Sequence, residues 1–183
     1  MSKTTIKPSR PVFPSPVALI TSASESGTPN IITLAEVFNV SIHNPVIVGI
    51  AVRPATYSHD LILESGEFGV NLAEVELLDK VDICGTVSGR EVDKFKKFDL
   101  TPVDSISIEP PLIEECPVNI ECKLWKNLTV GDHELILGEV QEVHVDNRLL
   151  DENDQINTSK LDTFAYLESE YWSLGEKVGD HGF

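Results

Sequence analysis

Apolar residues are grouped into runs of strand length, and polar or turn-forming residues separate these runs. The runs occupy residues 17–22, 30–35, 45–52, 66–72, 118–128 and 134–145. Valine and isoleucine, which favour strands, are frequent in them. The run at 45–52 has no polar interruption, which is typical of a strand buried on both faces. The pattern therefore predicts a mainly β protein.

The segments between the runs predict how the strands are joined. Residues 23–29 read Ala-Ser-Glu-Ser-Gly-Thr-Pro, and this turn chemistry predicts a hairpin between the first two strands. Residues 129–133 join the two long strands, whereas 36–44 and 146–162 are expected to be irregular. His144 alternates with valines near the end of its strand, and we expect it on the surface.

Two further segments have helical patterns. Residues 74–82 carry apolar side chains at the spacing of an amphipathic helix. Ser88 followed by Glu91 matches a capping box, and Phe95 and Phe98 can face the core from the helix that it begins. We therefore expect short helices at these two places.

The residues after the buried run at 45–52 combine groups that bind anions. Arg53 ends the run, and Thr56 and Ser58 are suitable N-caps for a short helix. An arginine, two hydroxyls and a helix N-terminus at one place are what a bound phosphate needs. The alternative is a capped turn in which Arg53 pairs with a surface carboxylate, and this stretch alone leaves both interpretations open.

A second group of cations lies in the helix that is predicted after Ser88. Arg90 and Lys94 are four residues apart, so on a helix they share one face beside the N-terminus, where the dipole also favours an anion. The alternative is an ordinary solvated helix that carries an Asp93 to Lys97 ion pair.

Composition limits the partners that we expect. The 183 residues include 14 Lys and Arg against 30 Asp and Glu, which gives a formal net charge of −16. A field of that sign repels nucleic acid and anionic membranes. No apolar run approaches the ~20 residues of a membrane span, and residues 1–7 lack the apolar core of a signal peptide. We therefore expect no nucleic-acid or membrane partner, and a cytoplasmic location.

The chain is expected to form a single domain over residues 1–183. Its 41% apolar content is enough for one sizeable core. Residues 7–16 carry four prolines, and residues 1–13 should form an extended N-terminal arm. Residues 164–183 form a C-terminal tail, which its aromatic residues should dock. The three cysteines form no Cys-x-x-Cys pair and are expected to be reduced thiols.

Standard catalytic motifs are absent from the sequence. There is no dinucleotide fingerprint, phosphate loop, zinc-protease motif or serine-hydrolase elbow, and the histidines lack metal-ligand spacing. We therefore expect no metal site and no catalytic side chain. If the chain does redox work, an organic cofactor would carry the chemistry.

Many short motifs follow one another in a fixed order along the chain. They end, in order, at Ser22, Asn30, Pro45, His59, Asn71, Gly85, Arg90, Phe95, Cys122, His133 and Val140, and they include Gly-x-Pro-Asn, Tyr-Ser-His, Gly-Glu-Phe-Gly-Val-Asn, Cys-Gly, Ser-Gly-Arg, Gly-Asp-His and Gly-Glu-Val. This order, over about residues 14–175, resembles the flavin reductase-like family, and within it the flavoredoxin-like branch. The resemblance implies a six-stranded Greek-key split β-barrel with a few short helices. It also implies bound FMN and a homodimer with the flavin near the subunit interface.

The resemblance assigns roles to particular residues. The implied cofactor-binding residues are Thr33, Leu34, Ala35, Arg53, Tyr57, Ser58, Ser88 and Lys94. The first three would offer backbone groups to the flavin ring, and the others would form the phosphate site. His133 would lie on the nicotinamide side and is the implied substrate-binding residue. Glu36 stands where many relatives carry an aromatic residue, and an acid so close to the ring would oppose flavin reduction.

The implied function is FMN-dependent oxidoreduction. NADH or NADPH would pass a hydride to the flavin, and electrons would leave to free flavin, a ferric complex or a protein acceptor. The protein would position and tune the ring. Two alternatives stay open, namely a flavoredoxin-type electron carrier that does not use NAD(P)H and a non-enzymatic FMN-binding protein.

Overall fold

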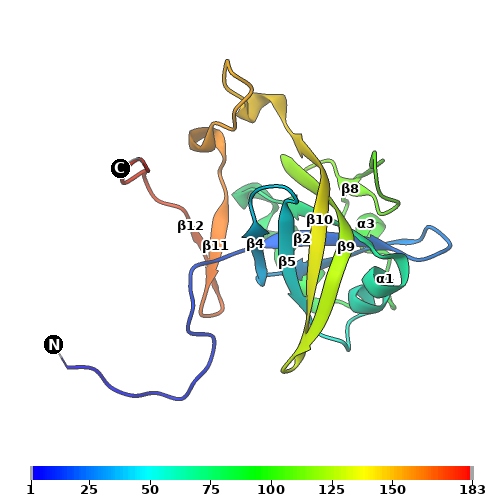
Figure 1. Ribbon diagram of the computed structural model, residues 1–183, viewed down its shortest axis with the longest axis horizontal. Helices are drawn as coiled ribbons and strands as arrows, with labels where there is room; N and C mark the ends of the chain where they lie inside the picture. Colours follow the sequence, from blue (N-terminus) through cyan, green and yellow to red (C-terminus); the bar gives the residue numbers. More distant parts are fainter. Residues whose placement is uncertain (1, 182–183) are drawn as a thin grey trace.

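The computed structural model describes residues 2–181, and these form the mainly β fold that the sequence predicts (Figure 1). The strands are β1 (Ser15–Pro16), β2 (Ala18–Ala23), β3 (Pro29–Leu34), β4 (Val37–Ser41), β5 (Ile47–Val52), β6 (Glu67–Leu72), β7 (Pro102–Val103), β8 (Leu112–Ile113), β9 (Val118–Val130), β10 (His133–Val145), β11 (Phe164–Leu167) and β12 (Glu170–Ser173). The α-helices are α1 (Tyr57–Ser65), α2 (Leu78–Thr86) and α3 (Lys94–Lys97), and the 3-10 helices are η1 (Val75–Leu77), η2 (Asn147–Leu149) and η3 (Thr158–Lys160). Between residues 2 and 181, no helix is long and apolar enough to cross a membrane.

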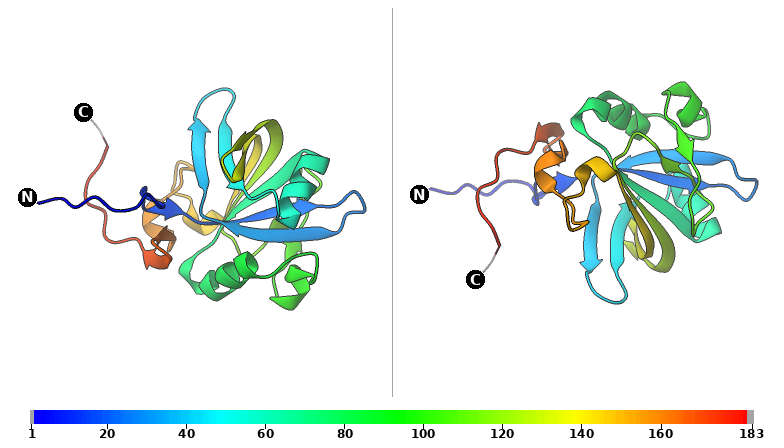
Figure 2. Two further views of the ribbon diagram at one scale, coloured as in Figure 1. Left: turned by 90° about the horizontal axis from the view of Figure 1, so that it is seen from below. Right: turned by 90° about the horizontal axis from the view of Figure 1, so that it is seen from above.

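The central sheet curls into a barrel because its two edge strands are consecutive in the chain. Within residues 2–181 this sheet has seven strands in the order β3-β2-β6-β9-β10-β5-β4, and every pairing in it is antiparallel. The edge strands β3 and β4 are joined by Ala35 and Glu36 alone, which brings the two edges of the sheet together. Figure 2 shows the strands wrapping around a common interior. The predicted hairpin is confirmed as β2 and β3.

One strand lies where the sequence interpretation expected irregular structure. Residues 36–44 contain β4, so that expectation is wrong, and the described sheet has one strand more than the six predicted. The signal was present, because Phe38, Val40 and Ile42 alternate with polar residues. β4 packs tightly on β5, since a Cβ at Gly49 would lie 2.5 Å from the Phe38 ring.

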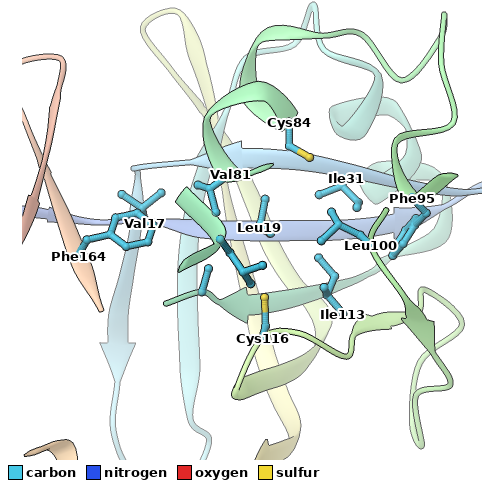
Figure 3. Packing of buried hydrophobic residues seen from close by; sticks show 12 residues of the cluster. Val17, Leu19, Ile31, Val81, Cys84, Phe95, Leu100, Ile113, Cys116 and Phe164 are labelled. Carbon is cyan, nitrogen blue, oxygen red and sulfur yellow. The ribbon is translucent and has the colours of Figure 1, made fainter. Parts of the chain in front are cut away.

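Strand β2 separates two hydrophobic cores. Leu19 faces the core that α2 covers, together with Cys84 and Cys116 (Figure 3), whereas Ile20 faces the interior of the barrel. The expectation of reduced thiols is confirmed, because all three cysteines are buried and free. Burial raises the pKa of the Cys84 thiol to about 11.

The two ends of the chain lie together beside the barrel. Strands β1, β11 and β12 form a small sheet, and Figures 1 and 2 show both termini on this side. Phe164 is 5% exposed, and the partly buried Tyr166 and Tyr171 pack against the same core. Trp172 remains 55% exposed, so the aromatic tail docks through part of its side chains only.

A buried carboxylate holds the segment between β7 and β8 against the barrel. Glu121 on β9 is 0% exposed. Its carboxylate accepts hydrogen bonds from the backbone amides of Ile106 at 2.8 Å and Ser107 at 2.6 Å. His144 Nε2 lies 2.7 Å from Glu121 Oε1. The expectation that His144 is a surface residue holds only in part, because its side chain is 31% exposed and pairs with a core acid.

Candidate functional site

A pocket of about 210 Å³, here called the polar pocket, lies between the start of α1, the start of β3 and the turn after α2. Its lining residues are Asn30, Ile32, Ala55, Thr56, Tyr57, Ser58, Gly85, Thr86, Val87, Ser88, Gly89, Arg90 and Lys94. Thr56 is the N-cap of α1, as predicted, and its hydroxyl accepts the His59 amide at 3.4 Å. The N-terminus of α1 therefore adjoins a pocket with several hydroxyl groups.

One wall of the polar pocket carries a buried polar atom without a partner. Asn30 is 3% exposed, its Nδ2 donates to Ser58 Oγ at 2.7 Å, and its Oδ1 accepts no hydrogen bond from the described residues. An unpaired buried group of this kind costs about 1–3 kcal/mol. Turning the amide over would let the Ser58 hydroxyl donate to Oδ1 and would leave Nδ2 as a free donor for a bound anion.

The turn after α2 replaces a helix that the sequence interpretation expected. The capping-box prediction at Ser88 is wrong, because α3 begins at Lys94 with Asp93 as its N-cap. Ser88 Oγ instead accepts the Arg90 amide at 3.2 Å. Gly89 brings this turn against β3, since a Cβ there would lie 1.8 Å from Asn30 Oδ1.

Two cations line the polar pocket, although they do not share a helix face as predicted. Lys94 is 3% exposed, and its Nζ donates to the carbonyls of Ile31 and Cys84, each at 2.6 Å. Burial lowers the pKa of Lys94 below its ordinary value of 10.5. An ammonium group has three protons, so two carbonyls leave one proton for a ligand in the pocket.

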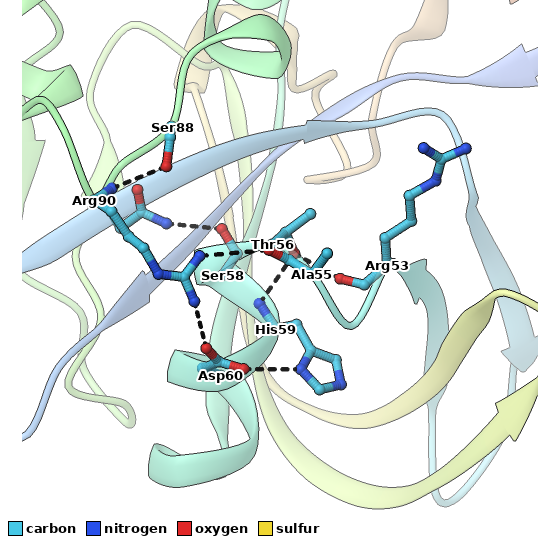
Figure 4. A network of polar contacts seen from close by, with 9 residues as sticks. Arg53, Ala55, Thr56, Ser58, His59, Asp60, Ser88 and Arg90 are labelled. Carbon is cyan, nitrogen blue, oxygen red and sulfur yellow. Dashed lines mark hydrogen bonds and ion pairs between the residues drawn. The ribbon is translucent and has the colours of Figure 1, made fainter.

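Arg90 is the more exposed of the two cations that line the polar pocket. Its guanidinium lies 5.0 Å from the centre of the Tyr57 ring. It also donates to Asp60 Oδ2 at 2.5 Å (Figure 4). Stacking and pairing of this kind hold a planar guanidinium in one orientation. Arg53, by contrast, extends away from this network in Figure 4 and is not among the lining residues. Its Nη2 lies 4.0 Å from Asp132 Oδ2, and this is the surface pairing that the sequence left as the alternative.

A second pocket, here called the tyrosine pocket, has a volume of about 220 Å³ and adjoins the first. Its lining residues are Arg10, Val17, Thr33, Ala35, Glu36, Asp82, Gly85, Thr86, Tyr166 and Tyr171. The two pockets share Gly85 and Thr86 as lining residues, so they lie side by side, and the pair is here called the two-lobed groove. Pockets that hold drug-sized ligands have volumes of about 300–1,000 Å³, so a ligand of that size would need both lobes.

Acidic groups and tyrosines surround the tyrosine pocket. The Tyr171 hydroxyl donates to Asp82 Oδ1 at 3.0 Å, and burial together with Asp82 raises the pKa of Tyr171 to about 12. Tyr171 therefore stays protonated at neutral pH. Arg10 pairs with Glu36 and lies 5.0 Å from the centre of the Tyr166 ring.

The structure brings together most of the residues that the resemblance selected. Tyr57, Ser58, Ser88 and Lys94 line the polar pocket, and Thr33 and Ala35 line the tyrosine pocket. Three of the selected residues lie outside both linings. Leu34 is packed in the barrel core, Arg53 pairs with Asp132, and His133 Nδ1 lies 2.8 Å from the same aspartate.

Asn30 and Arg10 are among the lining residues that the sequence interpretation missed. Asn30 ends the Gly-x-Pro-Asn motif, and its position after a turn and at the start of a strand is the signal that could have identified it. Arg10 belongs to the extended arm, and no local pattern relates it to a pocket formed by β3, α2 and β11.

Known proteins match this chain over most of its length. The family described as "Flavin reductase like domain" matches residues 9–174. A flavin reductase (NADPH) of Lentzea aerocolonigenes is 31% identical over 132 residues, which cover 72% of this chain and 74% of that protein. The structure of flavoredoxin from Desulfovibrio vulgaris (Miyazaki F) superposes with a TM-score of 0.91 at 26% identity, over 98% of this chain and 97% of that chain.

A second solved structure supports the architecture. A protein of Shewanella frigidimarina, described as a flavin reductase with a split barrel domain, has a TM-score of 0.83 at 20% identity, over 92% of this chain and 86% of that chain. At this identity the likeness concerns the fold alone. The predicted mainly β split-barrel fold is thus confirmed.

Proposed function

The chain belongs to the flavin reductase-like domain family, and from this premise we propose that it is an FMN-binding oxidoreductase. In this proposal NADH or NADPH gives a hydride to FMN, and electrons leave to free flavin, a ferric complex or a protein acceptor. Bound FMN would supply the hydride chemistry, and the protein would bind and orient it. The relative from Lentzea aerocolonigenes, which is named for NADPH, supports a nicotinamide donor.

The two-lobed groove is the observation that carries the proposal. FMN has a planar ring system at one end and a single phosphate at the other. The polar pocket offers the donors that a phosphate needs, namely the Ser58 and Ser88 hydroxyls and the Lys94 ammonium. The tyrosine pocket adjoins it and exposes the end of β3 to a flat ligand. The residues present therefore fit FMN better than they fit riboflavin, which lacks the phosphate.

The test is to mix the purified full-length protein, saturated with FMN, with NADH and with NADPH in the absence of oxygen. We expect at least one nucleotide to bleach the visible flavin absorbance, and the colour to return when a ferric complex or free flavin is added. A protein that binds no FMN at all would overturn the proposal.

An electron carrier is the second candidate function. The superposition with flavoredoxin at a TM-score of 0.91 favours it. In that case dithionite or a reduced protein donor would bleach the bound flavin, whereas NADH and NADPH would not. The same anaerobic titration therefore separates the two functions.

We further propose that the protein works as a homodimer. An apolar surface, here called the outer patch, consists of Phe38, Val40, Leu128, Leu135 and Leu137 on β4, β9 and β10. Leu128 lies opposite Leu135, and both Leu137 and Phe38 lie opposite Gly49, so these side chains share one face of the sheet. Phe38, Val40 and Leu128 are 44%, 48% and 56% exposed. A contiguous apolar patch of this kind suits a two-fold interface with a second copy.

The outer patch also offers a role for His133. This residue precedes Leu135 by two positions on β10, so it lies on the same face as the patch. In a dimer that uses the outer patch, His133 faces the second copy. We propose that it reaches the nicotinamide side of the flavin across this interface.

Leu128→Glu is expected to weaken dimerisation by about tenfold or more, because the charge would enter an apolar interface twice. Light scattering at micromolar concentrations should give a dimer mass for the wild-type protein and a lower average mass for the variant. Val178→Glu, which changes an apolar side chain that is 103% exposed outside the patch, is the matched control. A wild-type monomer mass would contradict the proposed dimer.

A further inference from the structure

The N-terminal arm contributes one residue, Arg10, to the lining of the tyrosine pocket. The residues of the arm from Ser2 to Phe13 are exposed, but the Arg10 guanidinium lines the pocket. It pairs with Glu36 in the β3–β4 connection and lies 5.0 Å from the centre of the Tyr166 ring on β11. Cation–π stacking and the ion pair together fix the guanidinium beside the pocket.

Charge at the tyrosine pocket is unbalanced without this residue. Its described lining carries two acids, Glu36 and Asp82, and Arg10 is the single cation among these lining residues. Asp82 accepts a hydrogen bond from the neutral Tyr171 hydroxyl, which does not cancel its charge. Arg10 therefore compensates Glu36 at the place where the proposed function puts the flavin ring.

We propose that Arg10 is a positioning residue that raises the reduction potential of bound FMN by keeping Glu36 compensated. This inference rests on the proposed function. Transfer of a hydride from NAD(P)H brings two electrons and one proton, so it adds one negative charge to the flavin. An uncompensated carboxylate near the ring disfavours that charge and stabilises oxidised FMN relative to reduced FMN. Pairing with Arg10 removes most of this penalty, so Glu36 no longer opposes reduction of the flavin strongly.

The ion pair between Arg10 and Glu36 contributes little to the stability of the fold. The Arg10 and Glu36 side chains are 43% and 31% exposed, and pairs so exposed contribute little to stability. Their effect on a charge that develops inside the adjoining pocket is larger, because the pocket walls exclude part of the water.

Arg10→Ala, Glu36→Gln and the double variant form the experiment, with the midpoint potential of bound FMN as the readout. The ratio of the dissociation constants for oxidised and reduced FMN is a second readout. We expect Arg10→Ala to shift this ratio by about tenfold towards oxidised FMN, which is about 30 mV more negative for a two-electron couple. Glu36→Gln should shift the potential in the positive direction, and the double variant should return close to the wild-type value.

Lys177→Ala is the matched control, because it removes one exposed cation that pairs with Asp180 and lines neither lobe of the groove. Its potential should equal that of the wild type. An unchanged potential in Arg10→Ala, or a drop that Glu36→Gln does not reverse, would overturn the inference while FMN binding and the proposed function stand. A wild-type protein that binds no FMN would overturn the proposed function itself, and the inference with it.

Discussion

Glu121→Gln is expected to lower the free energy of unfolding by about 3 kcal/mol at neutral pH. The carboxylate accepts the amides of Ile106 and Ser107 and the Nε2 of His144 while it is 0% exposed. Glutamine has nearly the same shape but keeps one acceptor oxygen, so at least one of these donors would lose its partner or face the new NH₂ group. Hydrogen bonds to charged groups contribute about 1.5–3 kcal/mol each.

The same carboxylate predicts how stability depends on acid. Burial by itself raises the pKa of Glu121, but the amides of Ile106 and Ser107 and the His144 side chain outweigh burial and hold the pKa below its ordinary value of 4.5. The folded state therefore binds fewer protons than the unfolded state in that range. The stabilisation is present above about pH 4.5 and is lost as the pH falls through the lowered folded value.

Urea unfolding of the wild type and Glu121→Gln at pH 7 and at pH 3.5 would measure both effects. The difference between the two proteins should shrink as the pH falls. Glu142→Gln is the matched control, because Glu142 lies opposite Glu121 on β10 and is exposed, so it should change stability by less than about 0.5 kcal/mol. A difference that is equal at both pH values would show that the Glu121 charge does not contribute.

The parts of the fold that the sequence predicted are those that local patterns determine. The strands β9 and β10 have long apolar runs joined by Gly131 and Asp132, and these favour one hairpin wherever the sheet lies. The Thr56 cap likewise depends on residues three positions away. Such features need no knowledge of the rest of the protein.

The errors arose where two local signals competed or where a distant residue decided the outcome. Ser88 and Glu91 match a capping box, but Gly89 disfavours helix and has to fit against Asn30 on β3, so Asp93 caps the helix instead. Nothing in the sequence near His144 shows that a core acid on β9 will reach it.

The candidate site depends even more on contacts between distant segments. The polar pocket joins Asn30, Ser58 and Lys94 from three elements, and the tyrosine pocket joins Arg10 to Tyr166 across most of the chain. Only the ordered set of motifs, through the resemblance to a family, indicated that Ser58 and Lys94 would meet. The residues around Arg53 did not predict its partner, because this cation follows a strand as a phosphate ligand would but pairs with Asp132.

Lys94→Met is expected to weaken FMN binding by about tenfold to a hundredfold while riboflavin binding changes little. Lys94 Nζ uses two protons on the carbonyls of Ile31 and Cys84 and has a third for a phosphate in the polar pocket. A charge-assisted bond to a dianionic phosphate contributes roughly 1.5–3 kcal/mol, and riboflavin has the same ring without that group. Methionine keeps the length of the side chain but donates no hydrogen bond. Titration of the apo-protein with both ligands measures the preference directly.

Three further variants identify which cations hold the phosphate. Arg90→Ala should also reduce the preference for FMN over riboflavin, because Arg90 lines the polar pocket. Lys97→Ala should not, since Lys97 is exposed and lies outside that lining. Arg53→Ala tests the role that the sequence assigned to Arg53, which was to bind the phosphate. In the structure Arg53 pairs with Asp132 instead. Its loss should therefore change FMN affinity by about twofold or less. Equal losses of FMN and riboflavin affinity in Lys94→Met would instead mean that Lys94 serves the fold, by joining β3 to α2, and does not hold the phosphate.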